Sequence, residues 1–168
     1  HASPIEIRRF ITLMAAMDRA RDADRLWSNG VTLFRDHRWA FDPTQASRTG
    51  DLQEALKQTG VSQRHGDDSD AWCRLLRALS DAKSPAAVRM VIDSGQGDAI
   101  ELLSSVTALD QQQRPWFPLL RGPKISVMWV RILVTSDTRV TISNLSALRV
   151  SVDTQVQKVT EYLGIADT

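Results

Sequence analysis

The sequence has a single cysteine, Cys73, among its 168 residues. One cysteine excludes an internal disulfide and any four-cysteine zinc or iron–sulfur site within this chain. Because Cys73 has no recognisable histidine and acid partner in the sequence, we expect it to be a buried core residue. Sparse cysteine is typical of a protein that works in a reducing compartment, and we expect a cytoplasmic one.

Long apolar runs and a strong excess of one charge are missing as well. No run approaches the roughly 18 to 20 apolar residues that cross a bilayer, so we expect no membrane partner. The 21 basic and 20 acidic residues give a net charge of +1. Any nucleic-acid site must therefore be a local arrangement of cations. With 42% hydrophobic and 24% charged residues, the composition is that of one globular domain over 1–168.

Helix signals fill most of the chain. Ser3-Pro4-Ile5-Glu6 combines an N-cap, a proline at the first helical position and a capping-box glutamate. Apolar residues at helical spacing predict further helices at about 23–35 (with Val31 inward), 51–59, 72–79, 85–94, 98–106, 124–134 and 154–163. We expect a polar loop at 61–69 and irregular structure at 135–152, with one helical turn near 144–148. The predicted fold is an all-α, compact multi-helix domain.

The segment FPLLRGPKIS, Phe117 to Ser126, places a Gly-Pro turn and a lysine directly before the apolar run VMWVRILV. Gly122 lacks a side chain, so backbone N–H groups of the turn can approach a phosphate closely. Pro123 suits the first helical position, where no N–H is needed, and the N-terminus of the following helix favours an anion. Such a turn can hold a phosphate without reading base sequence. The GxxxxGK[ST] spacing of a P-loop is absent.

Lys124 falls in the first turn of that helix, where the helix dipole disfavours a cation by roughly 0.3–1 kcal/mol. Partial burial against Ile125, Met128 and Trp129 would add to the preference for the neutral amine. The neutral amine is the form that attacks carbon and forms a Schiff base. The alternative is a lysine that contacts only phosphate or solvent.

A second segment, Arg149 to Ile165, reads RVSVDTQVQKVTEYLGI and carries Asp153 between an extended apolar pair and a predicted helix. By itself, Asp153 is explained by a helix N-cap. Its interest comes from its combination with Lys124.

Together the two segments resemble the helix-hairpin-helix superfamily of base-excision DNA glycosylases. Members share a hairpin of the form LPGhGxKxA and a downstream VDxHVxR-like segment that ends in LGL, and the matching stretches here are PLLRGPKIS and SVDTQVQKVTEYLGI. The resemblance covers about residues 98–165, with the hairpin motif at about 98–134 and the aspartate segment at 149–165. For the earlier helices it is only architectural. It implies a glycosylase-like helical fold in which Lys124 is the lyase lysine and Asp153 the catalytic aspartate.

The chain departs from the family pattern at several positions. Leu120 replaces the first hairpin glycine, Arg121 the apolar residue between the glycines, and Gln155 the usual histidine. The separation between Lys124 and Asp153 is longer than in most members and is similar to that of the archaeal 8-oxoguanine DNA glycosylase branch. The cysteine cluster of endonuclease III-like members is absent.

The resemblance implies an enzyme that flips a damaged nucleotide out of double-stranded DNA. Lys124 would attack C1′ of the sugar, displace the base and form a Schiff base, and elimination at the 3′ phosphate would nick the strand. Asp153, as a carboxylate, would stabilise positive charge on the sugar and help to deprotonate the lysine, so no metal or cofactor is required. The expected partner is duplex DNA with a damaged base, an oxidised purine being favoured, or with an abasic site. We expect a monomer associated with the nucleoid.

Further contacts follow from the same resemblance. The hairpin residues that would hold the DNA backbone are Leu120, Arg121, Gly122 and Pro123. Met128, one helical turn after Lys124 and on the same face, could contact the flipped base, although core packing also explains it. The segment RHGDDSD matches no metal-ligand spacing. As a loop it could supply the wedge that fills the hole left by the flipped base, with Gln63, Arg64 and His65 as candidates.

Two other functions fit the same residues. One is a non-catalytic helix-hairpin-helix DNA-binding module, in which Lys124 contacts phosphate and Asp153 only caps a helix. The other is a helical interaction domain without a nucleic-acid function, which leaves the Gly122–Lys124 turn unexplained.

Overall fold

The computed structural model describes residues 1–19, 21–46, 49–136 and 138–149. In chain order these form α1 (Pro4–Met17), α2 (Ala23–Asp36), the 3-10 helix η1 (Arg38–Phe41), α3 (Thr49–Gln58), α4 (His65–Ser80), α5 (Ala86–Asp93), β1 (Gln96–Asp98), α6 (Ala99–Val106), α7 (Pro123–Thr135), β2 (Thr141–Ser143) and the 3-10 helix η2 (Leu145–Ala147). The described chain is therefore mostly helical, as the sequence predicts. Its only sheet within these ranges is the short parallel pair of β1 and β2.

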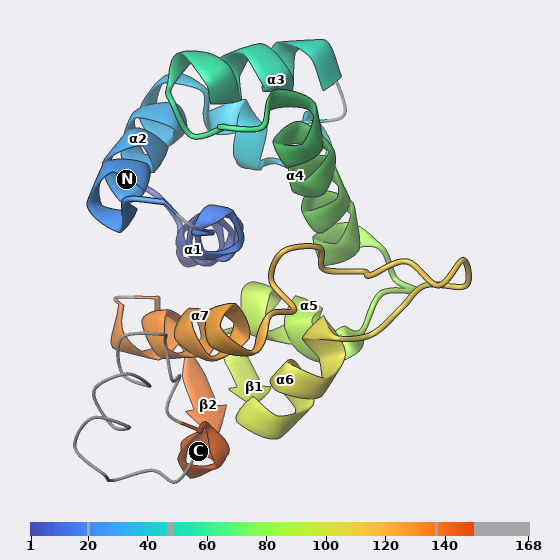
Figure 1. Ribbon diagram of the computed structural model, residues 1–168. Helices are drawn as coiled ribbons and strands as arrows, with labels where there is room; N and C mark the ends of the chain where they lie inside the picture. The colour runs from blue at the N-terminus through green and yellow to red at the C-terminus, as the bar shows by residue number, and fades with distance from the viewer. Residues whose placement is uncertain (20, 47–48, 137, 150–168) are drawn as a thin grey trace, which may run out of the picture.

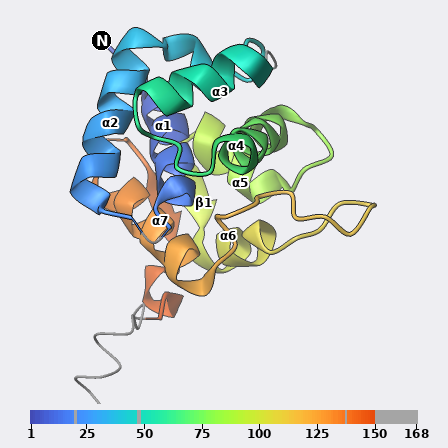
Figure 2. The ribbon, with the colours of Figure 1, turned by 45° about the horizontal axis from the view of Figure 1, so that its top comes forward.

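Helix α1 lies between two groups of elements (Figure 1). On one side lie α2, η1, α3 and α4, and on the other lie α5, α6, α7 and the two strands (Figure 2). Helix α1 packs against α7, α2, α5 and α4, so it joins the two groups. None of the described helices has the length and apolar character needed to cross a membrane.

The sequence of α1 explains its central position. Its predicted capping box is present: the Ser3 hydroxyl accepts from the Glu6 N–H at 3.4 Å, and the Glu6 carboxylate accepts from the Ser3 N–H at 2.8 Å. The Arg38 guanidinium also bonds this carboxylate and lowers the pKa of Glu6 to about 2, against the opposing effect of burial. After the capped first turns, every residue from Ile11 to Met17 is buried. A helix that is buried on all sides is expected only where other helices surround it.

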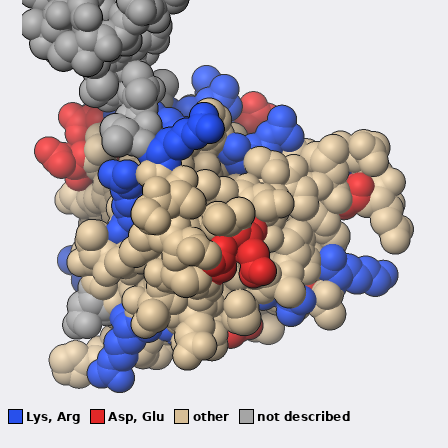
Figure 3. Space-filling model, turned by 90° about the horizontal axis from the view of Figure 1, so that it is seen from below, with Lys and Arg blue, Asp and Glu red and all other residues tan. Residues whose placement is uncertain are grey.

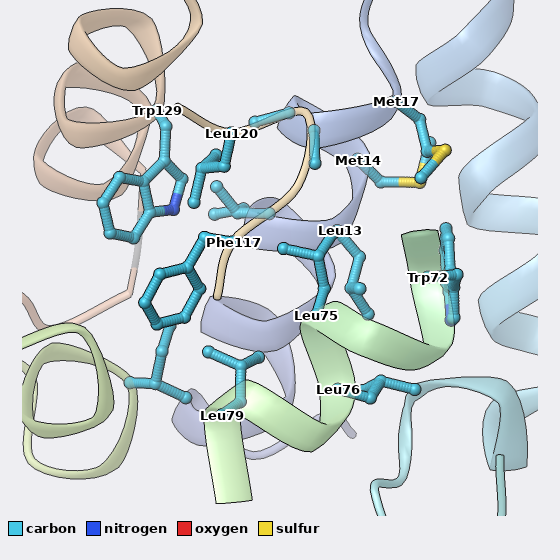
Figure 4. Packing of buried hydrophobic residues seen from close by; sticks show 14 of the residues in the cluster. Leu13, Met14, Met17, Trp72, Leu75, Leu76, Leu79, Phe117, Leu120 and Trp129 are labelled. Atoms are coloured by element: carbon cyan, nitrogen blue, oxygen red, sulfur yellow. The ribbon is translucent and has the colours of Figure 1, made fainter. Parts of the chain in front are cut away.

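The core joins α1, α4, α7 and the segment before α7 (Figure 4). Its largest fully buried side chains include Trp72, Trp129 and Phe117. The Trp129 indole donates to the Thr12 hydroxyl at 2.9 Å, which satisfies its N–H inside the core. The prediction that Cys73 is a buried core residue is confirmed.

Several predicted boundaries are wrong. Helix α4 begins at His65, inside the predicted 61–69 loop, because the Asp68 carboxylate fixes the preceding turn. Val31, predicted to face inward, is 60% exposed. Strand β2 occupies part of the predicted irregular segment, whereas the helical turn near 144–148 is confirmed by η2. The predicted helix at 154–163 lies outside the described residues.

The connection between α6 and α7 differs from a short hairpin turn. Both helices exist near their predicted positions, but part of the connection between them projects from the body of the molecule before the chain returns to the core at Phe117 and Leu120 (Figure 1). The projection is closed by an antiparallel bridge between Leu109 and Pro115. Inside it, the Asp110 carboxylate accepts the backbone N–H groups of Gln112 at 2.8 Å and Arg114 at 2.9 Å. Two helices joined in this way are not a compact two-helix hairpin.

Candidate functional site

Helix α7 begins as the sequence predicts. Gly122 is its N-cap, and Pro123 takes the first helical position. The Gly122 carbonyl accepts both the backbone N–H and the hydroxyl of Ser126, at 2.8 and 2.9 Å. No side chain caps this end of the helix, because the N-cap residue is glycine.

Gly122 is not required by the fold itself. Its φ of −65° is open to any residue, and a Cβ placed there would meet only the Ile125 side chain, at 3.9 Å. That distance is an ordinary van der Waals contact. Packing inside the protein does not require a glycine here. The missing side chain instead leaves the outer surface of the turn open to an approaching group.

Leu119 and Leu120 anchor the turn in different ways. Leu119 has a left-handed backbone, with φ at 66°, which is unusual for a leucine. Leu120, at the position of the first glycine in the family pattern, is completely buried and lies near Phe117 and Trp129 in the core (Figure 4). The Leu120 side chain is thus unavailable to a ligand, and only its backbone could fulfil the predicted contact with DNA. Arg121, which follows, is exposed.

Lys124 and Met128 lie on one face of α7, as their spacing predicts. With Val127, Arg131, Ile132 and Thr135 they line an open groove of about 270 Å³. Lys124 is exposed, so the predicted partial burial is wrong. Trp129, one of the residues expected to cover it, is fully buried, and its indole donates to the Thr12 hydroxyl. We refer to this feature as the α7 groove.

Asp18 is a neighbour of Lys124 that sequence reasoning missed. It follows the last residue of α1, and its backbone N–H donates to the Ala15 carbonyl at 3.2 Å. Burial raises the pKa of Asp18, while the positive charges of Lys124 and Arg21 oppose that effect. The charge of Lys124 therefore acts on the end of α1, a pairing across the two halves of the chain that no local sequence signal could reveal.

A second cavity of about 270 Å³ lies where the α1–α2 turn, the segment before α4 and the segment before α7 meet. It is lined by Met17, Arg19, Arg21, Gln63, Arg64, Asp67, Asp68 and Leu119. We refer to it as the arginine cavity. The structure brings the predicted wedge candidates Gln63 and Arg64 together here with Leu119 of the segment before α7. The third candidate, His65, is exposed at the start of α4 and is not among the lining residues.

Asp68 organises the arginine cavity. Its Oδ2 accepts from the backbone N–H groups of Gln63 and Arg64, from the Ser62 hydroxyl and from the Arg21 guanidinium, at distances of 2.8–3.1 Å. Burial would raise the pKa of Asp68, but these donors, the Arg64 N–H foremost, lower it below its ordinary value. Arg19 and Arg21 belong to the run DRARD, whose charges balance, so the sequence gives no sign of a basic site there.

The charges are distributed unevenly over the surface. In the view from below, Lys and Arg side chains gather most densely toward the upper edge, where some acidic side chains also lie, and further acidic side chains lie in the middle (Figure 3). Cations thus collect locally in a chain whose net charge is only +1. Across the described ranges, no group of three or more His, Cys, Asp or Glu side chains could hold a metal ion.

Asp153, the predicted catalytic aspartate, lies outside the described residues, as does most of its 149–165 segment. Comparison of the chain with protein-family models, with curated proteins and with solved structures finds no match.

Proposed function

We propose that this protein is a DNA N-glycosylase that removes a damaged base, an oxidised purine being favoured, and cleaves the resulting abasic site through a lysine Schiff base. The observation that carries the proposal is the arrangement at the start of α7. An exposed lysine shares a groove with Met128, directly after a turn whose glycine the fold does not need. A turn that can hold a phosphate, an amine that can act as a nucleophile and a partly apolar groove of the size of a base are thus adjacent.

The chemistry follows from the position of Lys124. Its neutral amine donates an electron pair to C1′ of the flipped nucleotide while the bond from C1′ to the base breaks, and the base leaves with that bond's electrons and takes up a proton. The attached nitrogen then loses a proton, the bond between C1′ and the ring oxygen breaks, that oxygen takes up a proton, and an iminium ion forms between C1′ and the lysine nitrogen. Loss of a proton from C2′ then expels the 3′ phosphate, and hydrolysis frees the lysine. In this proposal Asp153 stabilises the positive charge on the sugar and helps to deprotonate Lys124.

The α7 groove suits a planar base. Val127, Met128 and Ile132 supply apolar contact, and Arg131 supplies donors that can bond oxygen or nitrogen on the base edge. The Thr135 hydroxyl donates to the Arg131 carbonyl at 2.9 Å and offers an acceptor. Its volume of about 270 Å³ is near the lower end of small-molecule sites, which is roughly 300 Å³. Because oxidised purines differ from ordinary ones by added oxygen and N–H groups, polar side chains at one end of the groove favour them.

A second candidate is a non-catalytic DNA-binding module. The exposure of Lys124 favours it, since a lysine that only contacts phosphate has to be exposed. In that case the glycine turn and Lys124 position the DNA backbone and no covalent step occurs.

Borohydride trapping separates the two functions. The protein is incubated with a duplex that contains an abasic site, and borohydride reduces any Schiff base to a stable adduct. We expect an adduct with the wild type and none with Lys124→Gln. The matched control is Lys57→Gln, which removes an exposed lysine on α3, and it should form the adduct normally. Duplex binding without any wild-type adduct would refute the lyase and leave the binding module.

Base release tests the aspartate. On a duplex with an oxidised purine, Asp153→Asn should abolish release of the base while duplex binding persists, because only the charged transition state is affected. Undiminished release would remove Asp153 from the mechanism.

A further inference from the structure

The arginine cavity is separate from the α7 groove and is assembled from both halves of the molecule. Its lining comes from the end of α1 and the following turn, from the segment before α4 and from Leu119. Among the lining residues, Leu119 alone belongs to the segment before α7, and its left-handed backbone turns the chain there. A strand of DNA lying over the Gly122 turn would therefore pass close to this cavity.

Arg21 is the unusual group in the cavity. Its side chain is only 6% exposed, as is that of Asp68, and the two are joined by a contact of 2.8 Å. The Arg21 guanidinium also donates to the Val61 carbonyl. Its Nε, however, is buried without a hydrogen-bond partner among the described residues. A buried donor left unsatisfied costs roughly 1–3 kcal/mol, so a ligand that supplies an acceptor is favoured here.

The remaining charges favour an anion. The Asp68 carboxylate already accepts four donors, one of them the Arg21 guanidinium, so its charge is compensated internally. Arg19 and Arg64 are exposed at the cavity, opposed only by the exposed Asp67 among its lining residues. Planar guanidinium groups match the oxygens of a phosphate geometrically, and Gln63 adds an amide donor.

The apolar lining specifies the ligand further. Leu119, which is partly exposed, supplies the apolar surface of the lining, since Met17 is fully buried. A bare phosphate ion would not use this surface. A phosphate that carries a deoxyribose would use both parts of the cavity. We infer that the arginine cavity binds a backbone phosphodiester of the DNA strand, with Arg19, Arg21 and Arg64 around the phosphate and the adjoining sugar against Leu119. This inference rests on the proposed function, because it takes DNA as the partner.

The salt dependence of DNA binding tests the inference. Each phosphate contact contributes about −0.9 to the slope of log K against log salt concentration. Fluorescence anisotropy with an undamaged labelled duplex gives this slope for the wild type, Arg19→Gln and Arg64→Gln. Both arginine side chains are exposed, so these variants should fold, whereas a change at the buried Arg21 could unfold the chain. The control is Arg35→Gln, which removes an exposed cation near the far end of α2.

Because Arg19 and Arg64 would contact the same phosphate, we expect each of Arg19→Gln and Arg64→Gln to make the slope shallower by at most about 0.9, and Arg35→Gln to leave it unchanged. Slopes equal to that of the wild type in both variants overturn the inference. A second arm compares melting temperatures in inorganic phosphate and in chloride at equal ionic strength. If phosphate stabilises the wild type but neither variant, and the DNA slopes do not change, the cavity binds free phosphate and the assignment to DNA is overturned.

The borohydride adduct, measured on the same preparations, separates this inference from the proposed function. Unchanged slopes with a normal adduct overturn the cavity assignment alone. Shallower slopes without any adduct support the cavity as a phosphodiester site and overturn the lyase alone.

Discussion

The α7 groove and the arginine cavity differ in how the chain builds them. The groove comes from one continuous helix, so its lining residues follow helical spacing from Lys124 to Thr135. The arginine cavity comes from segments that are far apart in the sequence and are joined by the buried pair of Arg21 and Asp68. The groove should therefore tolerate substitution without loss of the fold, while the cavity contains a buried pair that fixes the α1–α2 turn to the start of α4.

The largest effect on stability is expected at Asp68. Asp68→Ala should lower the free energy of unfolding by about 3–5 kcal/mol, because it leaves the Arg21 charge buried and releases the donors of the segment before α4. Its neighbour Asp67 is exposed, and Asp67→Ala should change stability by less than about 0.5 kcal/mol. Urea denaturation of both variants measures the difference. Equal stabilities would mean that the Asp68 network does not support the fold.

The two leucines before α7 should also differ. Leu120→Ala should cost about 2–5 kcal/mol, because Leu120 is fully buried in the core. Leu119→Gly should change stability by less than about 1 kcal/mol, since relief of the left-handed backbone offsets the lost side-chain contact. Thermal or urea denaturation decides. A large loss of stability in Leu119→Gly would show that the Leu119 side chain, more than its backbone, holds the segment before α7 in place.

Acid should act on stability through Asp68 and Asp18 with opposite sign. The lowered pKa of Asp68 means that its contribution to stability is present above the ordinary carboxyl range and is lost as pH falls through the folded value. The raised pKa of Asp18 means the reverse: its contribution is present at low pH and is lost as pH rises through the folded value. Stability measured from about pH 7 to about pH 3 should fall less steeply in Asp68→Asn than in the wild type, and more steeply in Asp18→Asn. Parallel curves for all three proteins would contradict both assignments.

The smallest effect on stability, with a clear effect on binding, is expected at Gly122. A Cβ there meets no close contact, and the lost N-cap preference of glycine and the reduced freedom of the unfolded chain oppose each other. Gly122→Ala should thus change stability by less than about 1 kcal/mol. It should weaken duplex binding about tenfold, the effect of one lost hydrogen bond to a charged phosphate. Unchanged affinity would show that no phosphate approaches the turn.

The sequence predicts what depends on neighbouring residues. The start of α7 at Pro123, the helix predicted at about 98–106 and the shared face of Lys124 and Met128 all follow from local spacing. These features need no knowledge of distant contacts, because capping and helical periodicity act within one or two turns.

Features that depend on tertiary contacts were missed. The early start of α4 depends on donors to the Asp68 carboxylate from the turn before α4 and from Arg21. Arg21 is distant in the sequence, because α2 and α3 lie between it and Asp68. The exposure of Lys124 depends on where its neighbours pack, and its charge contact with Asp18 depends on how α1 meets α7. A periodic pattern also places Val31 inward, although no partner element covers it.

Locating the trapped lysine tests the central claim most directly. After borohydride treatment with an abasic duplex, the cross-linked protein is digested and the modified peptide is identified by mass spectrometry. The account predicts that the sugar fragment is attached to Lys124. Attachment to Lys57, to the N-terminal amine or to any other amine, or the absence of an adduct, would contradict it.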